Sequence, residues 1–427
     1  MLSAMLRRIS SEFAQAKKLL GFVSLQALGQ AFSMAVPLVI AQLFSKELFG
    51  RYSMSETLIF FFAALLVTSC RVSVIVYANQ ERQATGSIGK TFSAGFIFLA
   101  VGIIASAVIF IIFQKYLRIF AGITLQELIF LGTAFLGWTI KEFIVTTFYA
   151  LDKKIESALA EIAFGVTALS ALIIFFLSGA VSLNSVFSSY FIALIGAVLV
   201  GLIFIDRKLL APFGFDKGHF QQILTFSLWT VFGVMSAYLI NWGGLAVMRK
   251  FTSFAETGAY NLAFKFFKGY MALIYLIPAY FLPHISSSID NVVSMKSYLY
   301  RKRPRILLLG SAGLVLAYFV TPVVLRLLYK DKFIDCIPAV NILLIAVAAF
   351  LYSSFYATVF SALKEYKFIQ VAAVSQVIVN MILNFALIPS MGMAGAAAAT
   401  SISFVYLAII SEVYFRRKLK NKLLGAG

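Results

Sequence analysis

The sequence predicts an all-α polytopic membrane protein with twelve transmembrane helices, arranged as two six-helix bundles around a central cavity. The first observation is composition. The chain has 427 residues, of which 61% are hydrophobic and 12% are charged, and its mean hydropathy is +0.94. A soluble protein of this length does not need so much apolar surface. The other two observations are the distribution of lysine and arginine and an internal repeat.

Each predicted membrane helix is a run of about 20 mostly apolar residues. The first six runs cover 19–44, 53–76, 91–113, 124–149, 156–178 and 184–205. The second six runs cover 220–248, 257–287, 306–325, 334–362, 368–389 and 393–415. Because every connection between them is short, we expect no extramembrane domain.

The N-terminus predicts a short helix that lies along the membrane surface. Its apolar residues fall on one helical face and its basic residues fall elsewhere, a pattern typical of interfacial helices. The apolar face consists of Leu2, Met5, Leu6, Ile9 and Phe13. This segment lacks the long apolar block and small-residue cleavage site of a secretory signal peptide.

Basic residues predict the topology. With the N-terminus in the cytoplasm, the inside segments hold 23 of the 36 lysines and arginines and the outside loops hold nine. This asymmetry indicates that both termini are cytoplasmic. A net charge of +19 distributed in this way favours contacts with anionic lipid headgroups and excludes nucleic acid as the expected partner.

Two independent offsets predict a duplicated six-helix bundle. FGRYSMSETL at 49–58 aligns with TGAYNLAFKF at 257–266, pairing Gly50 with Gly258 at an offset of 208. The 44-residue runs 162–205 and 368–411 contain no charged residue and differ by 206. We therefore expect an N-lobe over 1–210 and a C-lobe over 211–427, with both copies in the same orientation in the membrane.

Four cations remain inside predicted helices: Arg71, Lys141, Lys265 and Lys268. Each would cost about 2.5 to 3.5 kcal/mol at the bilayer centre if left unpaired. Arg71 is close enough to the cytoplasmic end of its helix to extend to the headgroups, so an interfacial position and a cavity position are both open. Lys265 and Lys268 are one turn apart and too deep for this, and 257–287 contains no acid to pair with them. We expect both to face a hydrated cavity as an anion site, with a paired structural lysine as the alternative.

Few acids accompany these cations in the predicted helices: Glu56, Glu142 and Glu161. Lys141 is expected at the depth of Glu161, which leaves a structural ion pair and a ligand contact both open. Glu142 points about 100° away from Lys141 and is not its expected partner. The excess of cations favours an anionic cargo, while Glu142 and Glu161 are the candidates for H⁺ or Na⁺ coupling.

A polar stripe and three tyrosines are further candidates for the cavity lining. Gln376, Asn380 and Asn384 are spaced at i, i+4 and i+8 on one helix. Such a stripe either hydrogen-bonds to neighbouring helices or binds sugar hydroxyls. The rings of Tyr260, Tyr270 and Tyr275 could stack on sugars or simply pack in the protein interior.

The remaining reactive residue types predict no cofactor, metal site or disulfide. Cys70 and Cys336 are far apart in apolar sequence, and His219 and His284 are isolated from other metal-ligating residues. Neither pair has the spacing of a zinc site or a redox motif.

The stretch NFALIPSMGMAGAAAATSISF at 384–404 resembles the polysaccharide transporter family, the Wzx-type O-antigen and exopolysaccharide flippases of the multidrug/oligosaccharidyl-lipid/polysaccharide (MOP) superfamily. The similarity lies in Asn384, Ile388, Pro389, Gly392, Gly395 and Thr400. Pro389 and Gly392 are expected to break the helix for a tight outside turn. LFSKELFGRYSMSETL at 43–58 and TGAYNLAFK at 257–265 are similar to the family's connections before the second and eighth helices.

This resemblance implies a MATE/MOP-like fold in the bacterial inner membrane. It also implies translocation of an undecaprenyl pyrophosphate-linked oligosaccharide from the cytoplasmic to the periplasmic leaflet by alternating access, as in lipopolysaccharide biosynthesis. The interior arginine and lysines would engage the pyrophosphate and glycan, and a polysaccharide polymerase or assembly protein would be a partner. No further pair of helices follows residue 415, which favours the oligosaccharide branch over the fourteen-helix lipid II flippases.

Two alternatives stay open at the sequence level. A multidrug or cation antiporter of the same superfamily would favour cationic cargo and acids in the cavity. A membrane glycan polymerase, the enzyme alternative, would need a sizeable outside loop with catalytic groups, and the predicted outside loops are short.

Overall fold

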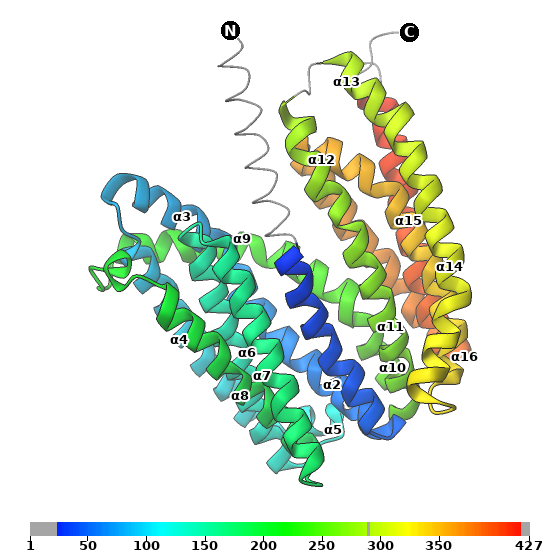
Figure 1. Ribbon diagram of the computed structural model, residues 1–427, viewed down its shortest axis with the longest axis horizontal. Helices are drawn as coiled ribbons and strands as arrows, with labels where there is room; N and C mark the ends of the chain where they lie inside the picture. Colours follow the sequence, from blue (N-terminus) through cyan, green and yellow to red (C-terminus); the bar gives the residue numbers. More distant parts are fainter. Residues whose placement is uncertain (1–23, 288–290, 420–427) are drawn as a thin grey trace. The chain divides into compact units, whose positions relative to one another are not determined.

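The computed structural model describes residues 24–287 and 291–419, and within these ranges the secondary structure is helical with no strand (Figure 1). The all-α, multi-pass class predicted from composition is therefore confirmed. The predicted interfacial helix near the N-terminus and the last residues of the basic tail lie outside the described residues.

Ten helices in the described part of the chain are long and apolar enough to cross a membrane. One of them, Tyr366–Leu419, reverses direction at a non-helical residue, Gly392, and thus accounts for two predicted spans. The predicted span 257–287 corresponds to α11 and α12, which are separated at Tyr275. With these two adjustments the described helices correspond to the twelve predicted spans.

Contacts divide the described chain into two compact units. The first unit contains the described residues up to Ile40 together with Leu58–Val234, and the second contains Ala41–Thr57 together with the described residues from Met235 onward. The lobes expected at 1–210 and 211–427 stay a prediction. The division by contacts places 41–57 in the second unit and 211–234 in the first.

The first unit begins with a helix over Ser24–Leu43, whose last residues belong to the second unit. Its other elements are the end of α2 (Lys46–Ala63), η1 (Ala64–Thr68), α3 (Ser69–Thr85), α4 (Gly89–Ile112), α5 (Gln114–Ala121), α6 (Leu125–Ala150), α7 (Lys154–Leu177), α8 (Leu183–Phe204), η2 (Arg207–Leu210) and most of α9 (Lys217–Tyr238). In this unit α8 packs against both α6 and α7, and α3 packs against α4 and α6.

The second unit contains the beginning of α2 and the end of α9. Its other elements are η3 (Leu239–Gly243), α10 (Gly244–Phe251), α11 (Phe254–Ile274), α12 (Leu276–Ser287), α13 (Val292–Lys296), η4 (Ser297–Lys302), α14 (Arg303–Tyr329), η5 (Ile334–Cys336), α15 (Ile337–Ala362), α16 (Tyr366–Tyr414) and η6 (Phe415–Leu419). In this unit α15 packs against α11, α14 and α16.

Helix ends follow from local sequence. The Thr124 side chain accepts from the Glu127 N–H, and the Glu127 carboxylate accepts from the Thr124 N–H, which together form a capping box at the start of α6. Such a cap satisfies backbone donors that a helix start leaves unpaired. Gly86 and Gly122 end α3 and α5 in the left-handed conformation that glycine adopts without steric cost.

The turn inside α16 is confirmed at one residue and differs at another. Gly392 has φ 55° and ψ −130°, and the Met393 N–H that follows donates to Glu256 Oε1 at 2.8 Å. Pro389 lies inside the helix before the turn, so the expectation that it also breaks the helix is wrong. A proline removes one backbone donor and need not end a helix whose neighbouring residues are satisfied.

The duplicated segments touch each other within the second unit. A Cβ atom added to Gly258 would lie 2.6 Å from the carbonyl oxygen of Lys46 and 2.8 Å from the backbone nitrogen of Gly50. One turn further on, Asn261 Nδ2 donates to Ser53 Oγ at 2.7 Å across a sequence separation of 208. This separation equals the offset of the sequence repeat, so α2 and α11 meet through equivalent positions, as elements do near a two-fold axis.

Candidate functional site

Lys265 is buried in an ion pair. Its side chain is on α11, which starts with Ser253 as N-cap, and is 8% exposed. Lys265 Nζ lies 2.6 and 2.7 Å from the two carboxylate oxygens of Glu56 on α2. Of the two interpretations left open by the sequence, the geometry of Lys265 is that of a paired lysine, with its acid supplied by a different helix.

Lys268, one turn further along α11, has a different environment. Its Nζ lies 3.7 Å from the ring centroid of Trp242 and 5.2 Å from that of Phe264. Among the residues that the structure describes, no acid lies within ion-pair distance of this Nζ. An ammonium over an indole face is stabilised by the cation–π interaction, which is stronger where water is excluded.

Trp242 joins the two lysines into one cluster. Its ring centroid is 5.0 Å from Lys265 Nζ as well as 3.7 Å from Lys268 Nζ. We call Glu56, Trp242, Lys265 and Lys268 the Lys268 cluster. The cluster contains two lysines and one carboxylate, and because Glu56 pairs with Lys265, Lys268 has no acid of its own among the described residues.

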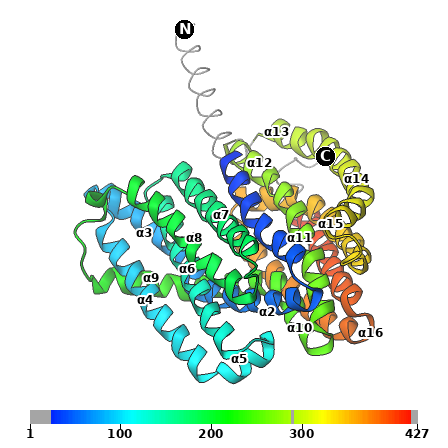
Figure 2. The same ribbon diagram turned by 60° about the horizontal axis from the view of Figure 1, so that its bottom comes forward.

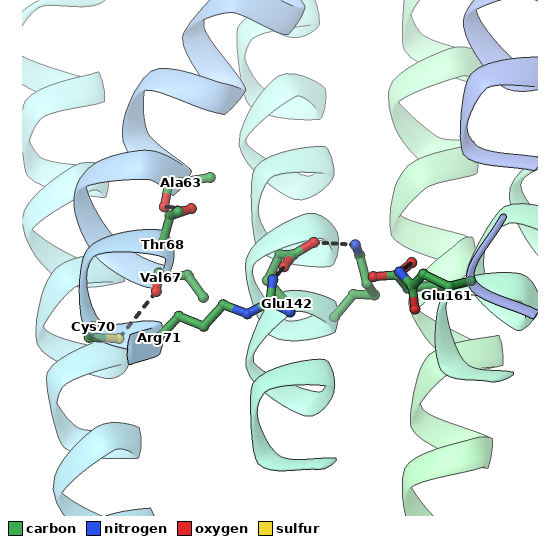
Figure 3. Close-up of polar contacts among 9 residues, drawn as sticks. Ala63, Val67, Thr68, Cys70, Arg71, Glu142 and Glu161 are labelled. Carbon is green, nitrogen blue, oxygen red and sulfur yellow. Dashed lines mark hydrogen bonds and ion pairs between the residues drawn. The ribbon is translucent and has the colours of Figure 1, made fainter. Parts of the chain in front are cut away.

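A second charged group lies in the first unit. We define the Glu142 cluster by its five polar residues, which come from the first helix, α3, α6 and α7: Gln26, Arg71, Lys141, Glu142 and Glu161. Figure 3 shows Arg71 extending from α3 toward Glu142, with Glu161 on the opposite side. Arg71 Nη1 is 3.5 Å from Glu142 Oε2, and the Lys141 ammonium forms an ion pair with the other carboxylate oxygen.

The contact between Lys141 and Glu142 corrects a prediction. Adjacent helical residues do point about 100° apart, but the flexible stem of lysine allows the ammonium to turn back to its neighbour. The ammonium also lies near aromatic rings, since Lys141 Nζ is 4.1 Å from the centroid of Trp138 and 5.4 Å from that of Phe164. Glu142 therefore pairs with both Arg71 and Lys141.

Glu161 has a neutral partner. Its Oε2 accepts a hydrogen bond from Gln26 Nε2 at 2.8 Å, and within the described chain it makes no ion pair. The Glu142 cluster contains two cations and two acids, so its charges balance. Of the two acids, Glu161 is the one whose charge is not committed to a salt bridge.

The polar stripe on α16 divides into two parts. Asn384 Nδ2 donates to Asn380 Oδ1 at 2.8 Å, and Asn380 Nδ2 is 3.4 Å from Ser403 Oγ after the turn. Gln376 instead lines a cavity of about 180 Å³, together with Ser353 and other residues of α15 and α16. Asn380 thus links the two halves of α16 and Asn384 bonds to Asn380, while Gln376 borders the cavity.

The three tyrosines also have distinct positions. Tyr260 is 1% exposed and shares a hydrogen bond of 3.4 Å with Thr400. The Tyr270 hydroxyl is 2.5 Å from that of Thr321. Tyr275 is 57% exposed and stands at the break between α11 and α12.

Sequence reasoning missed Trp242 and Gln26. Trp242 lies in η3, a π-helical segment, and π-helical turns leave no readable pattern in the sequence although they are frequent at functional sites. Gln26 is a single amide near the beginning of a long apolar run, and nothing in its spacing connects it to Glu161.

Solved structures with the same fold include transporters described as members of the MOP superfamily and a lipid II flippase. An inward-facing multidrug resistance MATE family transporter of the MOP superfamily matches with a TM-score of 0.77 and 12% identity, over 93% of this chain and 97% of that one. The lipid II flippase MurJ in an inward closed conformation matches with a TM-score of 0.67 and 16% identity, over 92% and 87%. The chain has the same fold as these proteins.

A third structure is a MOP superfamily transporter from Pyrococcus furiosus, described by the reverse polarity of its binding pocket, with a TM-score of 0.62 and 12% identity over 94% and 95% of the two chains. No protein-family model and no curated protein matches the sequence. The likeness to these structures therefore defines the fold of this chain.

Proposed function

We propose that this protein is a flippase for an anionic lipid-linked oligosaccharide, of the undecaprenyl pyrophosphate type, which it moves from the cytoplasmic to the periplasmic leaflet of the bacterial inner membrane by alternating access. The fold supports transport, since MATE transporters and MurJ share it. The anionic cargo is supported by the Lys268 cluster.

One observation carries this proposal: Lys268 stands against Trp242 with no acid beside it among the described residues. A cation in a membrane-spanning segment costs free energy, so such residues are rare and are usually retained for a function. Glu56 already neutralises Lys265, so a phosphate oxygen is the natural counter-charge for Lys268. The polyprenyl group of the substrate stays in the bilayer, because lipid tails are as apolar as that group.

The direct test is transport by Lys268 variants. Proteoliposomes with a labelled undecaprenyl pyrophosphate-linked oligosaccharide should show a loss of translocation for Lys268→Ala of about ten-fold or more, the value of one charge-assisted hydrogen bond. Lys268→Arg should keep most of the activity because the charge remains. Lys250→Ala, an exposed lysine on α10, is the matched control. Wild-type translocation by a folded Lys268→Ala protein would rule out this role.

A second candidate, a multidrug or cation antiporter, is favoured by the Glu142 cluster. Glu161 is an acid without a salt bridge in the described chain, held by Gln26, and such a group can bind a cation or a proton. We assign it to ion coupling in the flippase. Efflux of a cationic dye by proteoliposomes that do not translocate the lipid-linked glycan would favour the antiporter instead.

A further inference from the structure

An apolar groove runs between α4 and α6 in the first unit, at the end that α5 closes. Its volume is about 350 Å³, and its deep wall is formed by buried Phe110, Leu128 and Phe135. Two of its other lining residues, Ile111 and Ile129, are 68% and 63% exposed. Since both helices span the membrane, this open side faces a hydrocarbon environment.

The groove exists because of a glycine. Gly132 lines it, and a Cβ atom added there would meet no atom within 4 Å. Glycine in the middle of a helix costs about 1 kcal/mol relative to alanine. No neighbouring backbone or side chain comes close enough to Gly132 to require a glycine there. The absence of a side chain instead leaves the space that forms the groove.

The groove is bordered at one end by α5, a helix that carries two cations. Gln114 lines the groove and begins α5, which continues with exposed Lys115 and with Arg118 and contains no acid. Arg118 Nε is shielded from solvent and has no acceptor within the described chain. The acid that follows, Glu127, is occupied by the capping box of α6.

The position of α5 fits the boundary between lipid and water. Figure 2 shows this short helix at one end of α4. It carries its cations beside exposed Tyr116, which is 70% accessible, and Ile119, which is 61% accessible. Aromatic, aliphatic and basic residues together on a short helix are typical of a helix that lies in the headgroup region.

We propose that this groove is a binding site for an anionic phospholipid. One acyl chain lies in the groove along Gly132, and the headgroup phosphate accepts from Lys115 and Arg118. The bilayer is as apolar as the groove, so the chain gains packing contacts and little hydrophobic free energy. Selectivity therefore comes from the headgroup, where each cation is worth about a five-fold change in binding. This site is separate from the Lys268 cluster and does not depend on the proposed cargo.

The test compares retention of phosphatidylglycerol and phosphatidylethanolamine with identical acyl chains, by native mass spectrometry of the full-length protein. Wild type should retain phosphatidylglycerol at least about five-fold better. Lys115→Gln with Arg118→Gln should bring the two lipids within about two-fold of each other. Gly132→Leu should lower retention of both lipids several-fold, because its side chain starts from a Cβ position with no atom within 4 Å and extends into the groove.

Gly313→Leu is the matched control, since a Cβ atom at this glycine of α14 also meets no atom within 4 Å; it should retain both lipids as wild type does. A photoactivatable phosphatidylglycerol should label peptides from 103–136. Wild-type selectivity in the Lys115→Gln, Arg118→Gln variant, wild-type retention of both lipids in Gly132→Leu, or label elsewhere only, would overturn the proposal. Displacement of phosphatidylglycerol by undecaprenyl phosphate, with no displacement in return, would assign the groove to a polyprenyl chain and would also overturn it.

Discussion

At the scale of single residues, Glu56 and Lys265 form a buried ion pair in which each charge requires its partner. Both side chains are less than a tenth exposed, and both carboxylate oxygens contact the ammonium. A buried pair gains little over apolar residues of the same size, but removing one partner leaves the other as an uncompensated charge.

Replacement of Glu56 by glutamine should therefore destabilise the protein by about 3 to 5 kcal/mol. Lys265→Met added to Glu56→Gln should restore most of this loss because no isolated charge remains. Thermal unfolding of the purified variants in detergent measures both effects. A single variant as stable as wild type would contradict the burial of this pair.

Glu161 should determine ion coupling. In Glu161→Gln, translocation in proteoliposomes should become independent of an imposed proton or sodium gradient, because the amide has no charge to exchange. Glu156→Gln, in the first turn of the same helix, is the control and should keep the wild-type dependence. If Glu161→Gln also responds like wild type, the coupling group is elsewhere.

The sequence identified the charged residues of these clusters but not all of their partners. Lys265 could be placed deep in the membrane by counting along its helix, yet its acid is 209 residues away in the chain. The repeat offset of 208 contained a usable signal, because the position equivalent to Lys265 is Thr57 and Glu56 is next to it in the sequence. The pairing of Lys141 with Glu142 was missed because helical periodicity describes Cβ directions and not the reach of a lysine stem.

At the scale of elements, the turn between the two parts of α16 depends on one residue, Gly392. Gly392→Ala should lower stability by about 1 to 3 kcal/mol, because φ is positive there and a side chain would also approach Glu256. Gly313→Ala, in an open helical position, should instead be neutral or slightly stabilising. Thermal unfolding of the two variants side by side measures the difference. Equal stabilities would show that the turn tolerates a side chain.

Helix positions were largely predictable and helix irregularities were not. Apolar runs defined the spans because the bilayer requires about 20 apolar residues in each. The π-helical segments η1, η3 and η4 and the break at Tyr275 depend on how neighbouring helices pack, and packing is not encoded in any local run of residues.

At the scale of the whole molecule, the topology remains a prediction from the positive-inside rule. Both native cysteines are buried, so one introduced cysteine reports its own side of the membrane. Asp331→Cys should react with a membrane-impermeant maleimide in intact cells or spheroplasts, and Lys154→Cys should react only after permeabilisation. The reverse result would invert the proposed direction of transport.

The fold class could be predicted from global properties because they average over the whole chain. Hydropathy, charge asymmetry and the offset near 208 each depend on many residues, so no single misplaced side chain alters them. The assignment of 41–57 to the second unit could not be predicted in this way, since it depends on the contacts that α2 makes with α11.

Those contacts restrict the substitutions that the two repeated segments can accept. Gly50 approaches Gly258, and Ser53 bonds to Asn261, so each position has its own duplicate as a neighbour. A mutation that enlarges one copy takes up room needed by its counterpart, and the two halves cannot diverge independently there.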